Sequence, residues 1–174
     1  MSAPPALARL NALPPHEAEA ELREVCSAPG WAAAVAAARP FPDQETLADA
    51  AEAAWDALPR EDWIAGFEAH PQIGEERRRA GGEASAWSRA EQSGMAASAD
   101  GTREVLAAAQ RAYERRFGWP YIVCASGRSA DEMLADCRER FQRDPDAEIV
   151  TAMGEERRIG RLRLQKLLTT GGQA

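Results

Sequence analysis

His70 is the side chain best suited to acid–base chemistry near neutral pH. The chain has only two histidines, and His70 precedes Pro71, whose ring disfavours helical backbone at the residue before it. We therefore expect the imidazole to leave the end of a helix rather than lie along a helix face. The other histidine, His16, falls in the polar first turn of a predicted helix. Taken alone, a single histidine is more often structural or exposed than catalytic.

A possible partner for His70 follows about twenty residues later, in Ser88-x-x-Glu91-Gln92. Ser88 and Glu91 are three residues apart, so on a helix they project from the same side. The same spacing is that of a capping box, in which the two side chains satisfy backbone N–H groups at a helix start. A helix N-terminus also favours an anionic ligand. Capping and substrate binding are therefore both open, and they are compatible.

A run of five residues from Tyr121 to Ala125 differs from the rest of the chain, because it is apolar and partly β-branched. It follows Phe117-Gly118-Trp119-Pro120 and reads as one extended connector without a second strand to pair with. Buried backbone N–H and C=O groups need hydrogen-bond partners. A polar ligand can supply them here, and so can water or side chains.

Arg163 interrupts an apolar stripe near the C-terminus, in Leu162-Arg163-Leu164. A partly buried guanidinium needs an anionic partner, such as a substrate carboxylate or Glu91. Helical spacing alone does not choose between Arg163 and its neighbours Arg157, Arg158 and Arg161.

Helices must position these groups, because apolar residues recur at three-to-four spacing through a chain rich in Ala, Leu, Glu and Arg. Pro15, an Asp43 cap and a Ser129-x-x-Glu132 capping box predict helix starts, and Gly118 predicts a helix end. Helices are expected over residues 15–26, 31–38, 43–58, 88–97, 102–117, 129–143 and 145–168. Gly154 and Gly160 predict a bend or break in the last one. The first few residues and those after Leu168 are expected to fray.

Length and charge limit the possible classes of protein. The 174 residues fit one domain, residues 1–174. The net charge of −7, from 21 basic and 28 acidic residues, disfavours a nucleic acid or an anionic membrane as partner. No apolar run approaches the roughly 20 residues that span a bilayer.

The inventory of reactive side chains is equally limiting. Three cysteines without C-x-x-C spacing, and no signal-like N-terminus, favour a reducing, cytoplasmic setting. No pair of residues has metal-ligand spacing, so no metal is expected. Lys166 is the only lysine, and its amphipathic context favours a solvated amine over a Schiff base with a cofactor.

The order and spacing of four motifs, around His70, Ser88, Tyr121 and Arg163, give this chain a resemblance to the OHCU decarboxylases, where OHCU is 2-oxo-4-hydroxy-4-carboxy-5-ureidoimidazoline. The resemblance extends from Leu10 to the last helix. It implies an all-α, compact single-domain bundle of about eight helices, with the extended connector lining the active site. It also implies a cofactor-free homodimer acting on a small ureidoimidazoline.

By this likeness, His70 and Glu91 match the family's catalytic residues. The positions that match its substrate contacts are Pro71, Ser88, Arg89, Ala90, Glu91, Gln92, Tyr121, Ile122, Val123, Cys124, Ala125 and Arg163.

The implied activity is decarboxylation of OHCU to (S)-allantoin in urate breakdown, with His70 and Glu91 handling proton transfer. The C=N bond of such a substrate accepts the electrons released with CO2, so no cofactor is needed. The alternative from composition alone is a helical ureide-binding or protein-interaction domain without catalysis.

Overall fold

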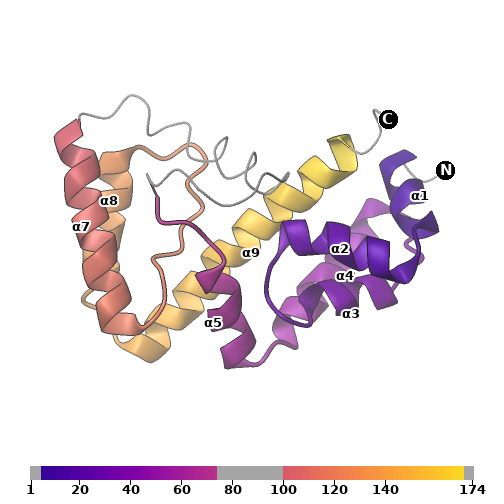
Figure 1. Ribbon diagram of the computed structural model, residues 1–174, viewed down its shortest axis with the longest axis horizontal. Helices are drawn as coiled ribbons and strands as arrows, with labels where there is room; N and C mark the ends of the chain where they lie inside the picture. Colours follow the sequence, from indigo (N-terminus) through magenta and orange to yellow (C-terminus); the bar gives the residue numbers. More distant parts are fainter. Residues whose placement is uncertain (1–4, 74–99, 171–174) are drawn as a thin grey trace. The chain divides into compact units, whose positions relative to one another are not determined.

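The computed structural model describes residues 5–73 and 100–170, and those residues form helices and connecting loops without a strand. Figure 1 shows the eight helices in chain order. They are α1 (Pro5–Ala12), α2 (Pro15–Val25), α3 (Trp31–Ala37), α4 (Gln44–Asp56), α5 (Arg60–Glu68), α7 (Asp100–Phe117), α8 (Ala130–Arg140) and α9 (Pro145–Thr170). The predicted all-α class with about eight helices is confirmed.

Local signals predicted the helix ends well. The Asp43 side chain accepts a hydrogen bond from the Thr46 N–H at the start of α4, and this bond lowers the pKa of Asp43. Ser129 and Glu132 form the predicted capping box of α8. Gly118 follows α7 with φ +84°, a left-handed conformation that glycine adopts without a steric penalty.

The predicted break in the last helix was wrong. The first few residues, which were expected to fray, lie outside the described part of the chain; α1, which was not predicted, starts at Pro5. The last helix, α9, is continuous from Pro145 to Thr170, so its glycines cause no break. Gly160 has a packing role, because a Cβ atom there would lie 2.3 Å from the ring of Trp55.

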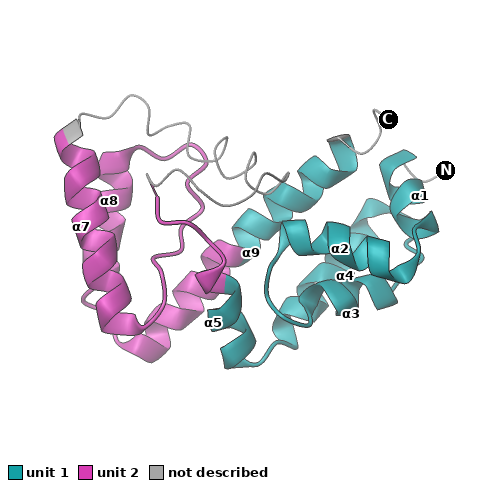
Figure 2. Ribbon diagram, in the orientation of Figure 1, with its two compact units in different colours: residues 1–66, 157–174 teal, residues 67–156 magenta. Residues whose placement is uncertain are grey.

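The described chain divides into two compact units, coloured separately in Figure 2. Unit 1 comprises residues 1–66 and 157–174, and unit 2 comprises residues 67–156. Helices α5 and α9 each contribute residues to both. The single domain over residues 1–174 stays a prediction.

The core of unit 1 is built around two tryptophans. The rings of Trp31 and Trp55 stack with centroids 5.0 Å apart, and both side chains are fully buried. The Trp31 indole N–H donates to the carbonyl of Ala51 at 3.1 Å. Such rings combine a large apolar area with a satisfied polar group, and they fix α3 against α4.

The core of unit 2 is partly polar. Buried aromatic rings from α7 and the connector meet there, with Tyr113 and Tyr121 edge to face at 5.4 Å. Arg140 of α8 and Glu148 of α9 are buried among them.

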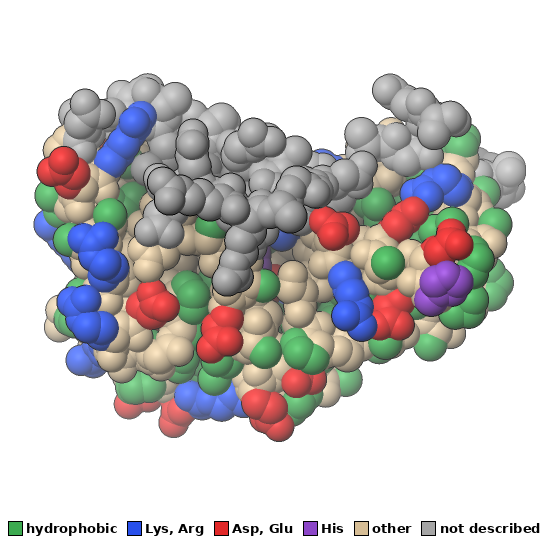
Figure 3. All heavy atoms as spheres, viewed as in Figure 1, with side chains coloured by type: hydrophobic (Ala, Val, Ile, Leu, Met, Phe, Trp, Pro, Cys, Tyr) green, Lys and Arg blue, Asp and Glu red, His purple; other side chains and the backbone are tan. Residues whose placement is uncertain are grey.

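The surface carries charges of both signs, and Figure 3 shows basic and acidic side chains interspersed on the face it draws. Within the described residues, no helix has both the length and the apolar composition for a membrane crossing.

Candidate active site

His70 lies just beyond the C-terminal end of α5, as its place before Pro71 predicted. Its backbone N–H donates to the carbonyl of Phe67 at 3.0 Å. The imidazole is mostly buried, with 12% of the side chain exposed. His16, by contrast, is 82% exposed in the first turn of α2. Of the two histidines, His70 alone has the partly enclosed setting of a reactive group.

A carboxylate that the sequence analysis did not select faces His70. Glu156 of α9 places its Oε2 atom 2.7 Å from His70 Nε2, and only 1% of its side chain is exposed. Both residues belong to unit 2. This is an ion-pair contact, and neither carboxylate oxygen of Glu156 accepts a hydrogen bond of regular geometry from the residues that the structure describes.

The chain after His70 is fixed to α7 by a second unpredicted residue, Gln110. Its side-chain amide accepts from the Ile73 N–H at 2.8 Å and donates to the Ile73 carbonyl at 2.9 Å. Gln110 is 1% exposed, so these bonds are shielded from water. Gln72 adds a bond to Glu114 of α7 at 2.8 Å. The segment from His70 to Ile73 is therefore held at both ends.

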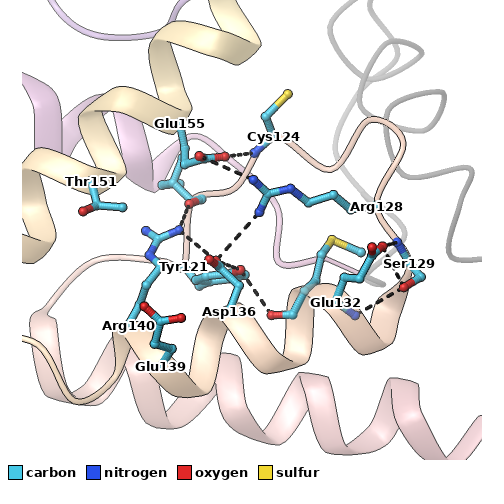
Figure 4. Close-up of polar contacts among 12 residues, drawn as sticks. Tyr121, Cys124, Arg128, Ser129, Glu132, Asp136, Glu139, Arg140, Thr151 and Glu155 are labelled. Carbon is cyan, nitrogen blue, oxygen red and sulfur yellow. Dashed lines mark hydrogen bonds and ion pairs between the residues drawn. The ribbon is translucent and has the colours of Figure 1, made fainter.

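The connector predicted from Tyr121 to Ala125 has neither helical nor strand structure, and four of its five residues are buried. Side chains satisfy two of its backbone groups, as Figure 4 shows. The Cys124 N–H donates to Glu155 Oε2 at 2.8 Å, and Arg140 Nη1 donates to the Ile122 carbonyl at 2.9 Å. The side-chain alternative therefore holds for these two groups, and substrate binding by the connector stays a prediction.

Arg140 organises the polar interior behind the connector. Its guanidinium, 1% exposed, donates from Nε to Glu148 Oε1 at 2.7 Å, and Tyr113 donates its hydroxyl to the same oxygen at 2.5 Å. The Tyr121 hydroxyl donates to Asp136. Burial opposes the charge of Arg140, yet the bond to Glu148 raises its pKa overall. Burial raises the pKa of both tyrosine hydroxyls, so they stay protonated donors.

Arg128 lies at the edge of this network, between two carboxylates. Its Nη2 atom is 3.7 Å from Glu155 Oε1, and its Nη1 atom is 3.9 Å from Asp136 Oδ2. About a third of its side chain, 31%, is exposed. Figure 4 shows it bridging α8 and α9 beside the connector. It was not predicted, because its Ser-Gly-Arg-Ser context reads as a turn before a helix cap.

Arg163 of α9 is 6% exposed, as expected of an arginine that interrupts an apolar stripe. Its neighbours Arg158 and Arg161 are exposed, and Arg161 bonds Glu52 at 2.6 Å. Burial therefore separates Arg163 from the arginines that helical spacing could not exclude. Arg163 belongs to unit 1 and His70 to unit 2.

The second predicted motif lies outside the described residues. It comprises Ser88, Arg89, Ala90, Glu91 and Gln92. Their proposed roles stay predictions. Pro71, the remaining predicted contact, is half-buried beside His70.

The position of Glu156 within the apolar stripe of α9 is a sequence signal for its burial. Along α9 the buried positions Ile149, Ala152, Glu156, Ile159, Arg163 and Leu167 follow three-to-four spacing. Glu156 thus interrupts the same stripe as Arg163, and the reasoning that selected the arginine applies equally to the acid. Gln110 gave no comparable signal, since a lone amide in a charged helix reads as solvated.

Comparison with known proteins identifies the family. The sequence model of the OHCU decarboxylase family matches residues 11–165. The 2-oxo-4-hydroxy-4-carboxy-5-ureidoimidazoline decarboxylase of Mus musculus is 34% identical over 140 residues, which are 79% of this chain and 78% of the mouse protein.

A plant relative is longer than this chain. The uric acid degradation bifunctional protein TTL of Arabidopsis thaliana is 31% identical over 153 residues, covering 87% of this chain. This chain spans about half of the plant protein, 47% of its length.

A solved structure shares the fold. The crystal structure of OHCU decarboxylase in the presence of (S)-allantoin matches with a TM-score of 0.75 and 29% identity, covering 86% of this chain and 97% of the other.

Proposed function

Because this chain belongs to the OHCU decarboxylase family, we propose that it converts 2-oxo-4-hydroxy-4-carboxy-5-ureidoimidazoline to (S)-allantoin, with release of CO2, in urate breakdown. The observation that carries the proposal is the family match over residues 11–165. The burial of His70 beside a carboxylate supports it, since that is the setting expected of a group that moves protons. The protein is then a carboxy-lyase.

The substrate's own bonds make the reaction possible without a cofactor. One ring carbon carries both the carboxylate and the hydroxyl, and the next carbon is joined to nitrogen by a double bond. When the bond to the carboxylate breaks, its electron pair forms a C=C bond between the two carbons. The C=N pair moves to nitrogen, which takes a proton. The hydroxyl then loses its proton and becomes a carbonyl, while the second carbon gains a proton that sets the stereocentre.

We assign the proton transfers to His70 and Glu91. His70 removes or steers the hydroxyl proton, and the two residues together govern proton delivery to one face of the second carbon. A general acid or base typically contributes about 10²- to 10⁴-fold to a rate.

Arg163, Ser88, Gln92 and the connector from Tyr121 to Ala125 hold the carboxylate, ureido and ring-oxygen groups. Fixing the substrate in this way presents one face to the proton donor. The connector is suited to binding because Glu155 and Arg140 fix its backbone from behind.

The activity test uses substrate generated fresh from the preceding oxidation and hydration of urate. Circular dichroism then follows the formation of chiral (S)-allantoin with and without the protein. We expect faster formation than in the spontaneous reaction, together with CO2 release. Ligand binding without CO2 release would instead favour a ureide-binding domain.

The role of His70 is tested with a matched pair of variants. His70→Asn should abolish turnover with unchanged helicity and melting temperature. His16→Asn changes the exposed histidine of α2 and should keep the wild-type rate. A near-wild-type rate in His70→Asn would remove His70 from the mechanism.

The expected assembly follows from the resemblance, and the expected location from the spacing of the three cysteines. We propose a cytoplasmic homodimer, and light scattering during size-exclusion chromatography measures the mass of the assembly directly.

A further inference from the structure

The pair formed by His70 and Glu156 suggests a role beyond proton transfer by the histidine alone. Glu156 Oε2 lies 2.7 Å from His70 Nε2. Both carboxylate oxygens are buried, and neither accepts a hydrogen bond of regular geometry from any residue that the structure describes. A buried carboxylate is costly unless it is paired. The imidazole is the one partner recorded for this carboxylate among the described residues.

The neighbouring acid on α9 has a different task. Glu155 accepts the backbone N–H of Cys124 at 2.8 Å and lies 3.7 Å from Arg128. Its contacts are those of a residue that holds the connector in place. Adjacent carboxylates on one helix thus serve two different segments, and only Glu156 is directed at the imidazole.

The backbone around His70 is already fixed without Glu156. The His70 N–H is bonded to Phe67, and Ile73 is clamped by Gln110. What the backbone leaves undetermined is the rotation of the ring and the nitrogen that carries the proton. A contact to Nε2 determines both.

We propose that Glu156 is a positioning residue that keeps the proton of neutral His70 on Nε2 and leaves Nδ1 as the base toward the substrate. A neutral imidazole has one N–H and one lone pair, and an ionised carboxylate only accepts. Nε2 facing Glu156 is therefore the donor, and Nδ1 keeps the lone pair. Hydrolase triads also use a carboxylate to orient a histidine, but there the carboxylate faces Nδ1 and Nε2 is the base.

The inference rests on the proposed decarboxylase function and deepens it. In the step concerned, the substrate's O–H bond breaks and its proton moves to Nδ1. The O–H electron pair forms the carbonyl, while the C=C pair moves to the second carbon, which binds the proton that sets the stereocentre. The imidazole becomes an imidazolium, and the negative charge of Glu156 stabilises it. The proton is later available for return to the product or to water.

Kinetics of two substitutions test the role. Glu156→Gln keeps the shape of the side chain but removes its charge. We expect kcat to fall by roughly 10- to 100-fold, the loss typical when a group that orients a metal-binding histidine is removed. KM and the melting temperature should stay near the wild-type values, because substrate contacts are unchanged. Glu156→Asp retains the carboxylate and should keep more of the wild-type kcat than Glu156→Gln.

A matched control removes a carboxylate from a surface pair. Glu139 is 71% exposed and pairs with Arg143 one turn along α8. Glu139→Gln should keep the wild-type kcat. If Glu156→Gln retains kcat within about twofold of an active wild type, less than 0.5 kcal/mol of barrier, the inference is wrong.

A second measurement does not depend on turnover or on a folded variant. In ¹⁵N-labelled wild-type protein, two-bond ¹H–¹⁵N correlations identify the protonated nitrogen of each neutral histidine ring. Only two histidines contribute, and exposed His16 is the internal reference. We expect His70 to be the Nε2–H tautomer; the Nδ1–H tautomer would overturn the inference. A wild type that yields no allantoin would reject the proposed function, and the tautomer would still decide the pairing with Glu156.

Discussion

The two units of this protein fill their interiors in opposite ways. Unit 1 stacks Trp31 on Trp55 and brings Gly160 of α9 against the Trp55 ring. Unit 2 buries the ion pair between Arg140 and Glu148, with Nη2 and Oε1 2.6 Å apart. In the apolar core of unit 1, each apolar surface that is buried adds to the stability of the folded state. The polar core fixes geometry but depends on every partner being present.

The largest effect is expected from breaking the polar core. Arg140→Met removes the guanidinium that bonds Glu148, which is 0% exposed, and among the described cations leaves only Arg143, 3.9 Å away. This should lower the free energy of unfolding by about 3–5 kcal/mol. Urea denaturation measures the loss. The same substitution at Arg23, whose pair with Glu19 is 69% exposed on the arginine side, should cost less than about 1 kcal/mol.

A double substitution sharpens this first prediction. Arg140→Met with Glu148→Leu removes both charges, so it should recover much of the stability lost by the single variant. Equal losses in the single and double variants would show that the ion pair is not what Arg140 contributes. In both variants the Ile122 carbonyl of the connector loses its hydrogen bond from Arg140, so reduced activity should persist.

The apolar core is tested through the two glycines of α9. Gly160→Ala places a Cβ atom 2.3 Å from the Trp55 ring, and overpacking of this kind costs about 1–3 kcal/mol. Gly154→Ala meets nothing within 4 Å and should stabilise the helix by about 1 kcal/mol or less. Thermal unfolding should therefore shift in opposite directions. If both substitutions shift the melting temperature in the same direction, helix propensity rather than packing against Trp55 determines the effect of Gly160→Ala.

The same contrast explains what the sequence could predict. Helix starts and ends depend on a few neighbouring residues, so Asp43, Ser129 and Gly118 indicated them correctly. The roles of Arg140 and Glu148 depend on partners far along the chain, and charged residues in a helix rich in Arg and Glu read as solvated.

The candidate site was predicted in the same partial way. His70 stood out because proline fixed its backbone, and Arg163 because it interrupts an apolar stripe. Glu156 interrupts that stripe too, but its meaning depends on His70, 86 positions earlier (156 − 70). Gln110 could not be predicted, because its contact is to the backbone of Ile73 rather than to a side chain of a particular type.

A smaller effect is expected at the cap of α8, which stabilises unit 2 locally. Ser129→Ala removes the side chain that accepts from the Glu132 N–H and should cost about 1 kcal/mol. Ser126→Ala, an exposed position in the preceding turn, is the control and should change stability by less than about 0.5 kcal/mol. If both variants unfold at the same urea concentration, the capping box contributes nothing measurable.

The smallest effect is expected from alkaline pH, which should lower the free energy of unfolding only slightly at first through the polar core. Burial raises the pKa of the Cys137 thiol to about 12, from an ordinary value of 9.0, and raises those of Tyr113 and Tyr121. These groups hold their protons more tightly in the folded state, so their contribution is complete below about pH 9 and is lost as the pH rises toward 12. Unfolding free energy from urea titrations should therefore begin to fall near pH 9. Cys137→Ala removes the first of these groups, and its free energy should fall less steeply between about pH 9 and 10. Identical slopes for the variant and the wild type would mean that the thiol does not contribute, and that the alkaline response of unit 2 comes from the tyrosines alone.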